Sequence, residues 1–495
     1  MRTLVWGLVL LAAAMPAAAD QRLGRIEFPT SGSVAAQPHF IRGVLLLHSF
    51  EFDDAADAFR QARQVEPGFA MAYWGEALTH NHPLWRYQNR DAALEVLAAL
   101  GPTAEARRAR APTPREQAYL ATLDVLYGDG DKPDRDRAYA GALAQLSRDF
   151  PDDDEARVLH ALAILGTNVE RRDFAVDMRA AAIVEDVFMR NPEHPGVLHY
   201  MIHAYDNPMH APLGLRAAAR YGRLAEHAAH ALHMTSHIFF ALGLWDDAVA
   251  ANEASWAASR SRVERKKLGA VEHGYHAYLW LSYAYLQQGR VQEARNVVDH
   301  MGRLLEEASV RRVAYHYAAG RAAWIVDAEA WNDLPAAPGA ISEAPPAARA
   351  ATLFAEGLAA ARRGDVAAAE RALADLEAAA QQTAPGHAHH GVAVSDGDRE
   401  GIAVTTQQLA AVVALARGDT ARGIELLQKA VEGEASMPYD YGPPFPVKPA
   451  NELLGEALLA DGRRAEAARA FRAALRRAPG RRLSVAGLAK AETKE

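Results

Sequence analysis

Histidine is the side chain of this sequence best suited to bind a metal ion, and the histidines are clustered. Of the 20 histidines in the 495-residue chain, half lie between His194 and His276. Within that stretch, His199, His203 and Asp206 are spaced i, i+4 and i+7, which places them within an arc of about 60° on one helix face. Imidazoles one helical turn apart can bind one ion together, because their nitrogens can each approach it to about 2.0–2.1 Å.

A second group, His230, His233 and His237, has the spacing i, i+3 and i+7 and shares a helix face in the same way. Each face is a candidate half-site for a transition metal, and imidazole and carboxylate ligands suit copper, iron or zinc. The alternative is that these histidines are interior polar residues, bonded to backbone carbonyls or to one another. The sequence leaves both interpretations open.

Motifs of common enzyme classes do not accompany these histidines. The pairs His199–His203 and His233–His237 have zinc-protease spacing, but neither has a glutamate directly after its first histidine to act as general base. The sequence also contains no GxxxxGK[ST] phosphate loop and no strand–turn–helix context for a dinucleotide fingerprint or a GxSxG elbow. We therefore expect a metal cofactor and no nucleotide cofactor.

The elements that must position these residues are helices in a repeat pattern. It is clearest between residues 451 and 479, at Leu454, Gly455, Leu458, Gly462, Ala467, Phe471, Ala474 and Pro479. Small residues let two antiparallel helices approach closely, a glycine turns the chain between them, and the phenylalanine fills the seam to the next repeat. The pattern recurs from Gly43 to Pro67, where Phe50 takes the place of the turn glycine. Further copies centre on Gly243, Gly289, Gly364 and Gly418.

This pattern resembles the tetratricopeptide repeat (TPR). The strings AMAYWGEA at 70–77 and HMTSHIF at 233–239 look like those of a group of exported bacterial TPR proteins, for which we can name no activity. The resemblance implies an all-α, TPR-type helical-hairpin solenoid, or superhelix, with an irregular histidine-rich N-terminal array and a regular C-terminal array. The resemblance indicates a fold but no reaction, so whether the chain is an enzyme stays open.

In TPR proteins the first helix of each repeat lines the concave surface, and the resemblance implies the same here. Counting from the turn glycines gives inward places to His48, Glu76, His80, His199, Asp206, His230, His233, His237 and His276, with His203 one place off the row. The candidate metal ligands are His48, His80, His199, His203, His230, His233, His237 and His276. The catalytic residue is unknown, and the candidate bases are Glu76, Asp206 and Glu272. Candidate groove or substrate residues are Trp74, His82, Trp85 and Tyr275.

Four segments divide the chain. Residues 1–19 are a predicted signal peptide, with Arg2 at its start, a short apolar stretch and a small-residue cleavage site at 17–19. We expect a periplasmic or secreted protein that starts at Asp20 and keeps no integral membrane segment. Residues 20–330 form the histidine-rich TPR-like array, 331–350 a Pro/Ala-rich linker and 351–495 the C-terminal TPR array.

Two local signals predict structure in detail. The sequence Thr113-Pro114-Arg115-Glu116 is a capping box with proline at the first helical position, so a helix should run from there to about Tyr127. The segment 439–449 contains four prolines and cannot be helical. We expect it to lie across the groove as an inserted segment.

Composition narrows the function further. The chain has no cysteine, which excludes disulfides and thiolate metal sites. Its 62 acidic and 54 basic residues give a net charge of −8, which argues against nucleic acid as a partner. Two hypotheses remain. The groove binds a transition metal through histidine and carboxylate side chains and is a candidate metalloenzyme site, or it is a non-catalytic scaffold for a peptide or partner protein.

Overall fold

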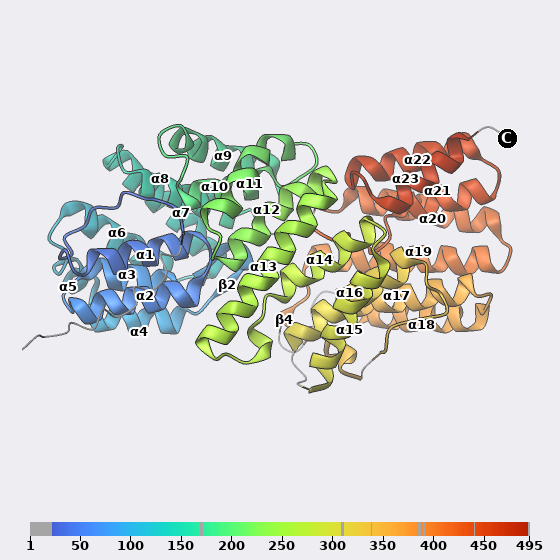
Figure 1. Ribbon diagram of the computed structural model, residues 1–495, viewed down its shortest axis with the longest axis horizontal. Coiled ribbons are helices and arrows are strands. Elements are labelled where there is room, and N and C mark those ends of the chain that lie inside the picture. Colours follow the sequence, from blue (N-terminus) through green and yellow to red (C-terminus); the bar gives the residue numbers. More distant parts are fainter. Residues whose placement is uncertain are drawn as a thin grey trace, which may run out of the picture.

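The computed structural model describes residues 22–168, 172–307, 311–337, 339–383, 388–389, 392–439 and 441–493. These form an elongated array of helical hairpins, with the N-terminal hairpins at one end and the C-terminal hairpins at the other (Figure 1). The prediction of an all-α, TPR-type solenoid is confirmed. The predicted signal peptide, residues 1–19, lies outside the described residues.

The N-terminal half is irregular in helix length and spacing, as predicted. Its helices are α1 (Gln37–His48), α2 (Phe52–Val65), α3 (Ala70–Leu78), α4 (Arg90–Leu100), α5 (Ala104–Arg108), α6 (Pro114–Leu126), α7 (Lys132–Asp149), α8 (Asp154–Gly166), α9 (Phe174–Phe188), α10 (Pro195–Tyr205), α11 (Ala211–Leu224) and α12 (Ala229–Leu242). A short excursion between α3 and α4 consists of β1 (Asn81–His82), the 3-10 helix η1 (Pro83–Trp85) and β2 (Tyr87–Gln88), with β1 antiparallel to β2.

The second half continues as helical hairpins. Its helices are α13 (Trp245–Lys266), α14 (Tyr275–Gln287), α15 (Val291–Glu307), α16 (Arg311–Ala328), α17 (Pro346–Arg362), α18 (Val366–Gln381), α19 (Asp396–Ala416), α20 (Thr420–Ser436), α21 (Ala450–Ala460), α22 (Arg464–Arg477) and α23 (Arg482–Glu492). Minor elements are the 3-10 helices η2 (Ala270–Glu272) and η3 (Gly339–Glu343) and the antiparallel pair β3 (Ala388–His389) and β4 (Val392–Ala393).

The seam between repeats has the composition that the sequence pattern predicts. A Cβ atom on Gly455 would lie 2.9 Å from the Phe471 ring, and one on Gly487 of the following helix would overlap the same ring. Phe59 is enclosed in the same way, between Gly43 and Gly75. A phenylalanine with glycine on both sides therefore joins neighbouring repeats at each end of the solenoid.

The Thr113 side-chain cap predicted at the start of α6 is present, but the Glu116 carboxylate accepts from the Thr113 hydroxyl and not from the Thr113 backbone N–H, so the box is formed only in part. The Glu116 backbone N–H donates to Thr113 Oγ1 at 3.2 Å, and Thr113 Oγ1 donates to Glu116 Oε2 at 3.0 Å. The helix ends at Leu126, one residue before the predicted end. This side-chain cap supplies a partner to an N–H group that the helix itself leaves unbonded.

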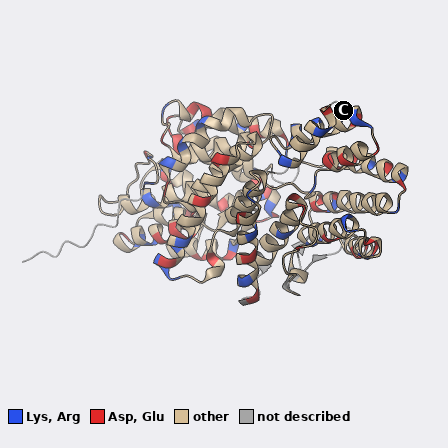
Figure 2. Ribbon diagram, turned by 45° about the vertical axis from the view of Figure 1, so that its right-hand side comes forward, with Lys and Arg blue, Asp and Glu red and all other residues tan. Residues whose placement is uncertain are grey.

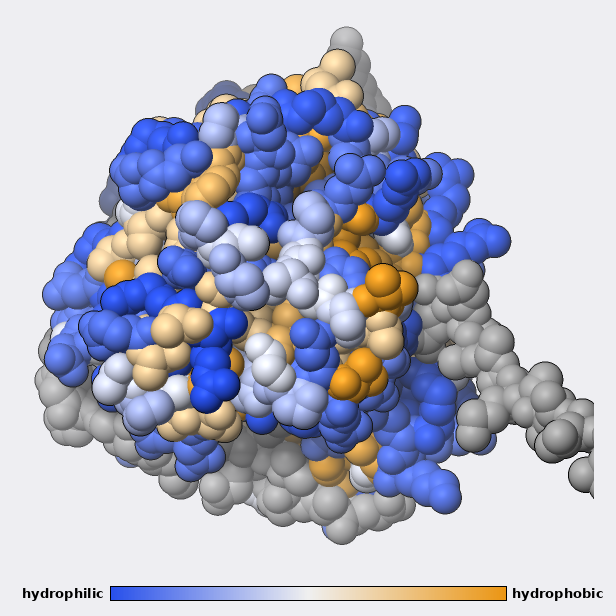
Figure 3. Space-filling view, turned by 90° about the vertical axis from the view of Figure 1, so that its left-hand side faces the viewer, coloured by the Kyte–Doolittle hydropathy of each residue, from blue (hydrophilic) through white to orange (hydrophobic). Residues whose placement is uncertain are grey.

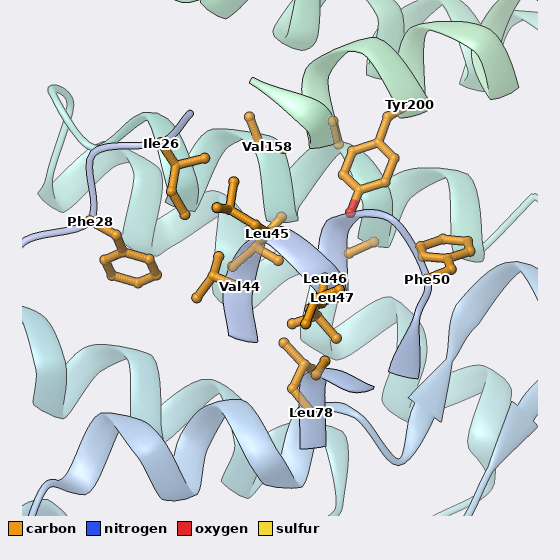
Figure 4. Packing of buried hydrophobic residues seen from close by; sticks show 14 of the residues in the cluster. Ile26, Phe28, Val44, Leu45, Leu46, Leu47, Phe50, Leu78, Val158 and Tyr200 are labelled. Atoms are coloured by element: carbon orange, nitrogen blue, oxygen red, sulfur yellow. The ribbon is translucent and has the colours of Figure 1, made fainter. Parts of the chain in front are cut away.

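Two large groups of buried side chains form the core, and they meet on α12. Ile238 belongs to the first group and Phe240 to the second. In the first group, Val44, Leu45, Leu46 and Leu47 of α1 lie among side chains of other helices, including Leu78 and Tyr200 (Figure 4). The predicted domain limits at residues 330 and 350 stay a prediction.

The C-terminal hairpins fold back onto the middle of the chain. The indole N–H of Trp245 donates to the Gly480 carbonyl oxygen at 2.9 Å. The buried guanidinium of Arg481 donates to Asp327 at 2.5 and 3.0 Å, to Glu452 at 2.8 and 3.0 Å and to Tyr283 Oη at 2.8 Å. The α22–α23 connection is thereby fixed to α14 and α16, and the second half closes on itself.

Acidic and basic side chains are interspersed over the helices (Figure 2). At the N-terminal end of the molecule, hydrophilic residues dominate the surface and apolar residues form small scattered groups (Figure 3). Among the described residues, no helix is long and apolar enough to cross a membrane.

Candidate metal centre

Six histidines from three inner helices come together in two groups of three. In the first triad, the candidate ligand atoms of His199, His203 and His230 all lie within 4.8 Å of one another. The second triad consists of His233, His237 and His276, within the same distance. Helix α10 supplies His199 and His203, α12 supplies His230, His233 and His237, and α14 supplies His276. The two predicted helix faces therefore meet.

The hydrogen bonds of Asn252 determine which nitrogen of His233 carries a proton. The Asn252 side-chain nitrogen donates to the Ala248 carbonyl oxygen at 2.9 Å, so the amide oxygen is the atom that faces His233. That oxygen lies 2.7 Å from His233 Nδ1 and must accept the N–H of the ring. In neutral His233, Nε2 therefore carries no proton and has a lone pair available for a ligand.

In the second triad, Asp206 is the hydrogen-bond partner of His237. Its Oδ2 atom lies 2.5 Å from His237 Nδ1, and a carboxylate in this position accepts the ring N–H. The Nε2 atoms of His233 and His237 then face each other at 3.2 Å. Two nitrogens that are each 2.05 Å from one ion and 3.2 Å apart subtend an angle of about 100°, close to the tetrahedral value.

The first triad shows a related arrangement. His199 Nδ1 donates to the backbone oxygen of His48 at 2.6 Å, which leaves its Nε2 as the unprotonated nitrogen of the neutral ring. That Nε2 lies 3.1 Å from Nε2 of His203. His230 Nε2 is buried and has no hydrogen-bond partner among the described residues.

Burial lowers the pKa of four of the six imidazoles and so favours their neutral form, which is the form that binds metals. It lowers the pKa of His199 to about 3, although the bond to the His48 carbonyl opposes the shift. Burial likewise lowers the pKa of His233 to about 3, helped by the nearby His237. The pKa values of His203 and His230 are lowered well below the ordinary range, again mainly by burial.

Aromatic rings and the proline-rich segment cover His237 of the second triad, whereas His276 is exposed. The His237 ring lies between Trp280, at a centroid distance of 4.3 Å, and Tyr441, at 5.1 Å. A Cβ atom on Gly442 would overlap the Trp280 ring, so only glycine allows this close approach. Tyr441 and Gly442 of the segment 439–449, hereafter the strap, thus pack beside the second triad, and the position of the segment across the groove stays a prediction.

Cavities adjoin both triads. One of about 210 Å³ reaches His203 and has polar walls that include Arg172, Asp177 and Tyr441. A smaller one of about 70 Å³ is lined by Asp206, His237 and residues of the strap. A small molecule in either cavity would lie beside a triad histidine.

Of the three candidate bases, the structure brings only Asp206 to the triads. The carboxylate of Glu76 pairs with Arg60, at 3.1 Å, and with Arg63, both on α2. Glu272 is exposed in η2. In the described part of the chain, neither Glu76 nor Glu272 shares a group of candidate ligand atoms with the triad histidines.

Two of the eight candidate ligands lie outside the triads. His48 is buried with His194 and Glu155, whose carboxylate oxygens lie 2.8 Å from His48 Nε2 and 3.0 Å from His194 Nε2. His48 Nδ1 also lies 2.9 Å from Tyr200 Oη, so both of its ring nitrogens have partners within the protein. His80 is not part of any triad. Burial lowers its pKa, and Glu76 opposes that shift.

The four candidate groove residues divide between wall and core. Trp85 is half exposed, and its ring lies 5.5 Å from that of His230, at the edge of the first triad. His82 stacks on Phe52 at 3.7 Å next to Trp85. Trp74 corrects the prediction, because it is fully buried in the core between Phe28 and Tyr119.

Tyr275 is also a core residue and not a groove wall. It is fully buried, and its hydroxyl donates to the Ala270 carbonyl oxygen at 2.6 Å. Trp74 and Tyr275 lie close in sequence to groove candidates, but packing against neighbouring segments places both side chains in the core.

Sequence reasoning missed Asn252, Trp280 and the buried group around Glu155. Asn252 and Trp280 lie on α13 and α14 and reach the second triad only through packing of whole helices. Asparagine in the interior of a helix is unfavourable unless its amide finds partners, and this was the available signal for Asn252.

The fold and the site together define an all-α, TPR-type repeat protein with a histidine-rich interior. No family model matches the chain, and a search of curated proteins found no relative. Solved structures resemble it at low identity. The APC/C hetero-tetramer Cut9–Hcn1 is 13% identical, with 94% of this chain and 78% of that chain covered and a TM-score of 0.36. Yeast Tom70 is 11% identical, with 91% and 86% covered and a TM-score of 0.34.

Human IFIT1, solved as a dimer with PPP-AAAA, is 13% identical, with 81% of this chain and 91% of that chain covered and a TM-score of 0.31. The identities and TM-scores are too low for these structures to add anything to the fold described above. They carry no argument about what it binds.

Proposed function

We propose that this protein binds a transition-metal ion at the second triad, His233, His237 and His276. The observation that carries the proposal is the approach of the His233 and His237 Nε2 atoms to 3.2 Å while the Nδ1 atom of each ring faces its own acceptor. Two lone pairs repel each other at that distance unless a cation lies between them. Acceptors that fix the outer nitrogen of a ligating histidine are the usual partners of such rings.

A proton is the alternative cation. If His237 were an imidazolium, its Nε2–H would donate to His233 Nε2 and Asp206 would balance the charge. The position of His276 favours a metal, because a shared proton needs two nitrogens and this site gathers three within 4.8 Å. The Asp206 carboxylate is compatible with a bound proton and with a bound metal ion, so direct metal analysis must distinguish the two.

The chemistry of the ligands supports copper, zinc or iron. All three ligands of the second triad are imidazoles, and the chain has no cysteine to provide a thiolate. At equal availability, the order of intrinsic affinity favours copper. A site with three protein ligands keeps a coordination position for a further ligand, which distinguishes reactive zinc sites from structural ones. The adjoining cavities give small molecules a place beside the ion.

The scaffold alternative has less support. In the closed second half, the side chains of Arg481, Lys448, Glu452 and Asp327 bind one another in the interior. The strap lies against α14 through Gly442 and Trp280. The protein's own residues thus occupy interior surface that a TPR scaffold would offer to a peptide.

We also propose that the chain is exported, because residues 1–19 have the charge, apolar stretch and small residues of a signal peptide. N-terminal sequencing of protein recovered from the periplasm or the medium should begin at Asp20. Recovery of the chain only from the cytoplasm, with Met1 or Arg2 at its start, would contradict this.

Metal analysis of untagged protein, purified without chelators, tests the main proposal. We expect close to one or more equivalents of copper, zinc or iron per chain, and loss of the bound metal in the double variant His233→Ala, His237→Ala. The control His227→Ala removes an exposed histidine and should keep the metal. Protein that contains no metal, and whose melting temperature does not rise when these ions are added, would overturn the proposal.

A further inference from the structure

Phe50 occupies a backbone conformation that the other hairpins give to glycine. Its φ of 56° lies in the left-handed region, where Gly243, Gly289 and Gly462 stand with φ of 69°, 75° and 79° at the corresponding turns. A side chain with a Cβ atom is strained there, and the strain is a cost that glycine would remove. Because glycine would remove this strain, the presence of phenylalanine here indicates a function for its side chain.

The Phe50 side chain contacts every member of the first triad. Its ring centroid lies 4.4 Å from that of His199, 5.4 Å from His230 and 6.1 Å from His203. The ring of Phe50 stacks on His230 and meets His199 edge to face. Phe50 itself is buried, so it separates these imidazoles from solvent on the α1–α2 side.

The His199–His203 contact of the first triad is satisfied either by a hydrogen bond from the His203 Nε2–H group or by a cation that the rings share. The 3.1 Å separation of the His199 and His203 Nε2 atoms matches that of the pair in the second triad, and the His199 tautomer is fixed by the His48 carbonyl oxygen. His230 supplies a third nitrogen, Nε2, buried without a hydrogen-bond partner. A buried polar atom without a partner is costly, and a bound ion would satisfy it.

We infer that the first triad binds a second transition-metal ion beside the one at the second triad, and that Phe50 is kept in its strained conformation to position the three imidazoles. This rests on the proposed function in assuming that the interior takes up metal. It adds a separate site, a count of two ions per chain and a positioning role for Phe50.

The two ions would occupy one chamber. Across the triads, ring centroids lie 6.0 Å apart for His203 and His237 and 6.2 Å apart for His230 and His233. Within each triad, the paired rings are 4.8 and 4.9 Å apart, only slightly less. No carboxylate belongs to either triad, so the pair would be held by neutral imidazoles with Asp206 outside them.

Titration of the full chain with Cu(II), stripped of metal beforehand, tests the second site. Wild-type protein should saturate at two ions, and the variants His199→Ala, His230→Ala and His233→Ala, His276→Ala should each saturate at one. Two Cu(II) ions in one chamber interact magnetically, so the EPR spectrum of the fully loaded protein should be broadened relative to the sum of the singly loaded variants. Saturation at one ion in wild type, or two ions with unperturbed spectra, would overturn the inference.

The variant Phe50→Gly tests the positioning role, because glycine suits the turn and the change removes the ring from the triad. Loss of this buried ring leaves a void, so we expect lower thermal stability without metal even though the backbone strain is relieved. At a temperature where the variant is folded, binding of the first-triad ion should be at least tenfold weaker and binding at the second triad unchanged. Phe50→Tyr should restore affinity. The control Phe52→Leu alters a neighbouring ring that stacks on His82 and on Phe50 but is not in ring contact with the triad histidines. Full affinity of both ions in Phe50→Gly would show that the ring does not position the triad.

The outcomes separate this inference from the proposed function. Wild-type protein that binds no ion would defeat both. Binding of one ion that depends on His233 and His237 but not on His199 and His230 would leave the proposed function in place and defeat the second site.

Discussion

Asp206 Oδ2 lies 2.5 Å from Nδ1 of His237, so the residue that ends α10 orients a ring on α12. The same helix carries two histidines of the first triad. Helix α10 therefore serves both groups, supplying ligands to one and an orienting carboxylate to the other. This contact links the triads chemically as well as spatially.

Asp206→Asn should weaken metal binding at the second triad by about 10- to 100-fold, the usual effect of changing a partner that orients a ligating histidine. The amide oxygen can still accept the His237 N–H, but the negative charge is lost. Competition titration with a chelator measures the change. Asp186→Asn, at a surface pair with Arg190, is the control and should bind as wild type does. An unchanged affinity in Asp206→Asn would remove Asp206 from the site.

Asn252→Leu should weaken the same site and also lower the free energy of unfolding by about 1–3 kcal/mol. The change leaves the buried His233 Nδ1 without an acceptor, so the ring can take the other tautomer and present Nε2–H toward His237. Metal titration and urea denaturation measure the two effects. Asn252→Asp keeps the acceptor oxygen, so a defect of equal size in that variant would argue against tautomer control.

The sequence predicted the helix faces but not what covers them. Spacing places His230, His233 and His237 on one face, because helix geometry is local. It cannot tell which helices cross that face, since crossing depends on how whole hairpins pack. The packing of α13 and α14 brings Asn252 and Trp280 to the second triad. For the same reason Trp74 was named as a groove candidate, whereas packing places it in the core.

The packing between repeats was easier to predict from the sequence. A phenylalanine flanked by glycines of neighbouring helices fills the space that the missing side chains leave. Phe471→Ala should lower the free energy of unfolding by about 3–5 kcal/mol, because it opens a void between Gly455 and Gly487. Chemical denaturation measures the loss. The surface variant Arg469→Ala on the same helix is the control. A loss below about 1 kcal/mol, as expected for a surface residue, would show that the seam is loosely packed.

A second stability prediction concerns the buried pair Arg481 and Glu452. Burial alone would raise the pKa of Glu452, but the charges of Arg481 and Lys448 outweigh it and lower the pKa. A carboxylate with a depressed folded-state pKa stabilises the fold above its unfolded pKa, about 4.3, and this contribution is lost as the pH falls through the folded value. Stability of the second half should therefore fall as acid is added below about pH 4.

Glu452→Gln should flatten this acid dependence while lowering stability at pH 7, where Arg481 loses half of its carboxylate partners. Denaturation curves at pH 7, 4 and 3 measure both effects. Glu293→Gln, at an exposed pair with Arg290, provides the comparison and should keep the wild-type pH profile. An unchanged slope in Glu452→Gln would show that other carboxylates govern the acid response.

The strap gives the last prediction. Gly442 combines a φ of 92° with contact to Trp280, so alanine there is strained in its backbone and also overlaps the indole. Gly442→Ala should therefore push the strap away from Trp280 and His237 and lower stability by about 1–3 kcal/mol. A chelator should then remove the ion from the second triad faster, because Tyr441 no longer covers His237.

The variant Gly462→Ala separates the effect of backbone strain from the effect of displacing the strap. Gly462 has a φ of 79°, but a Cβ atom there would meet no atom within 4 Å. This variant carries the same kind of backbone strain without a clash and without contact to the strap. It should lose a comparable amount of stability from its backbone while releasing metal at the wild-type rate. Equal rates of metal release in the two alanine variants would show that the strap does not control access to the second triad.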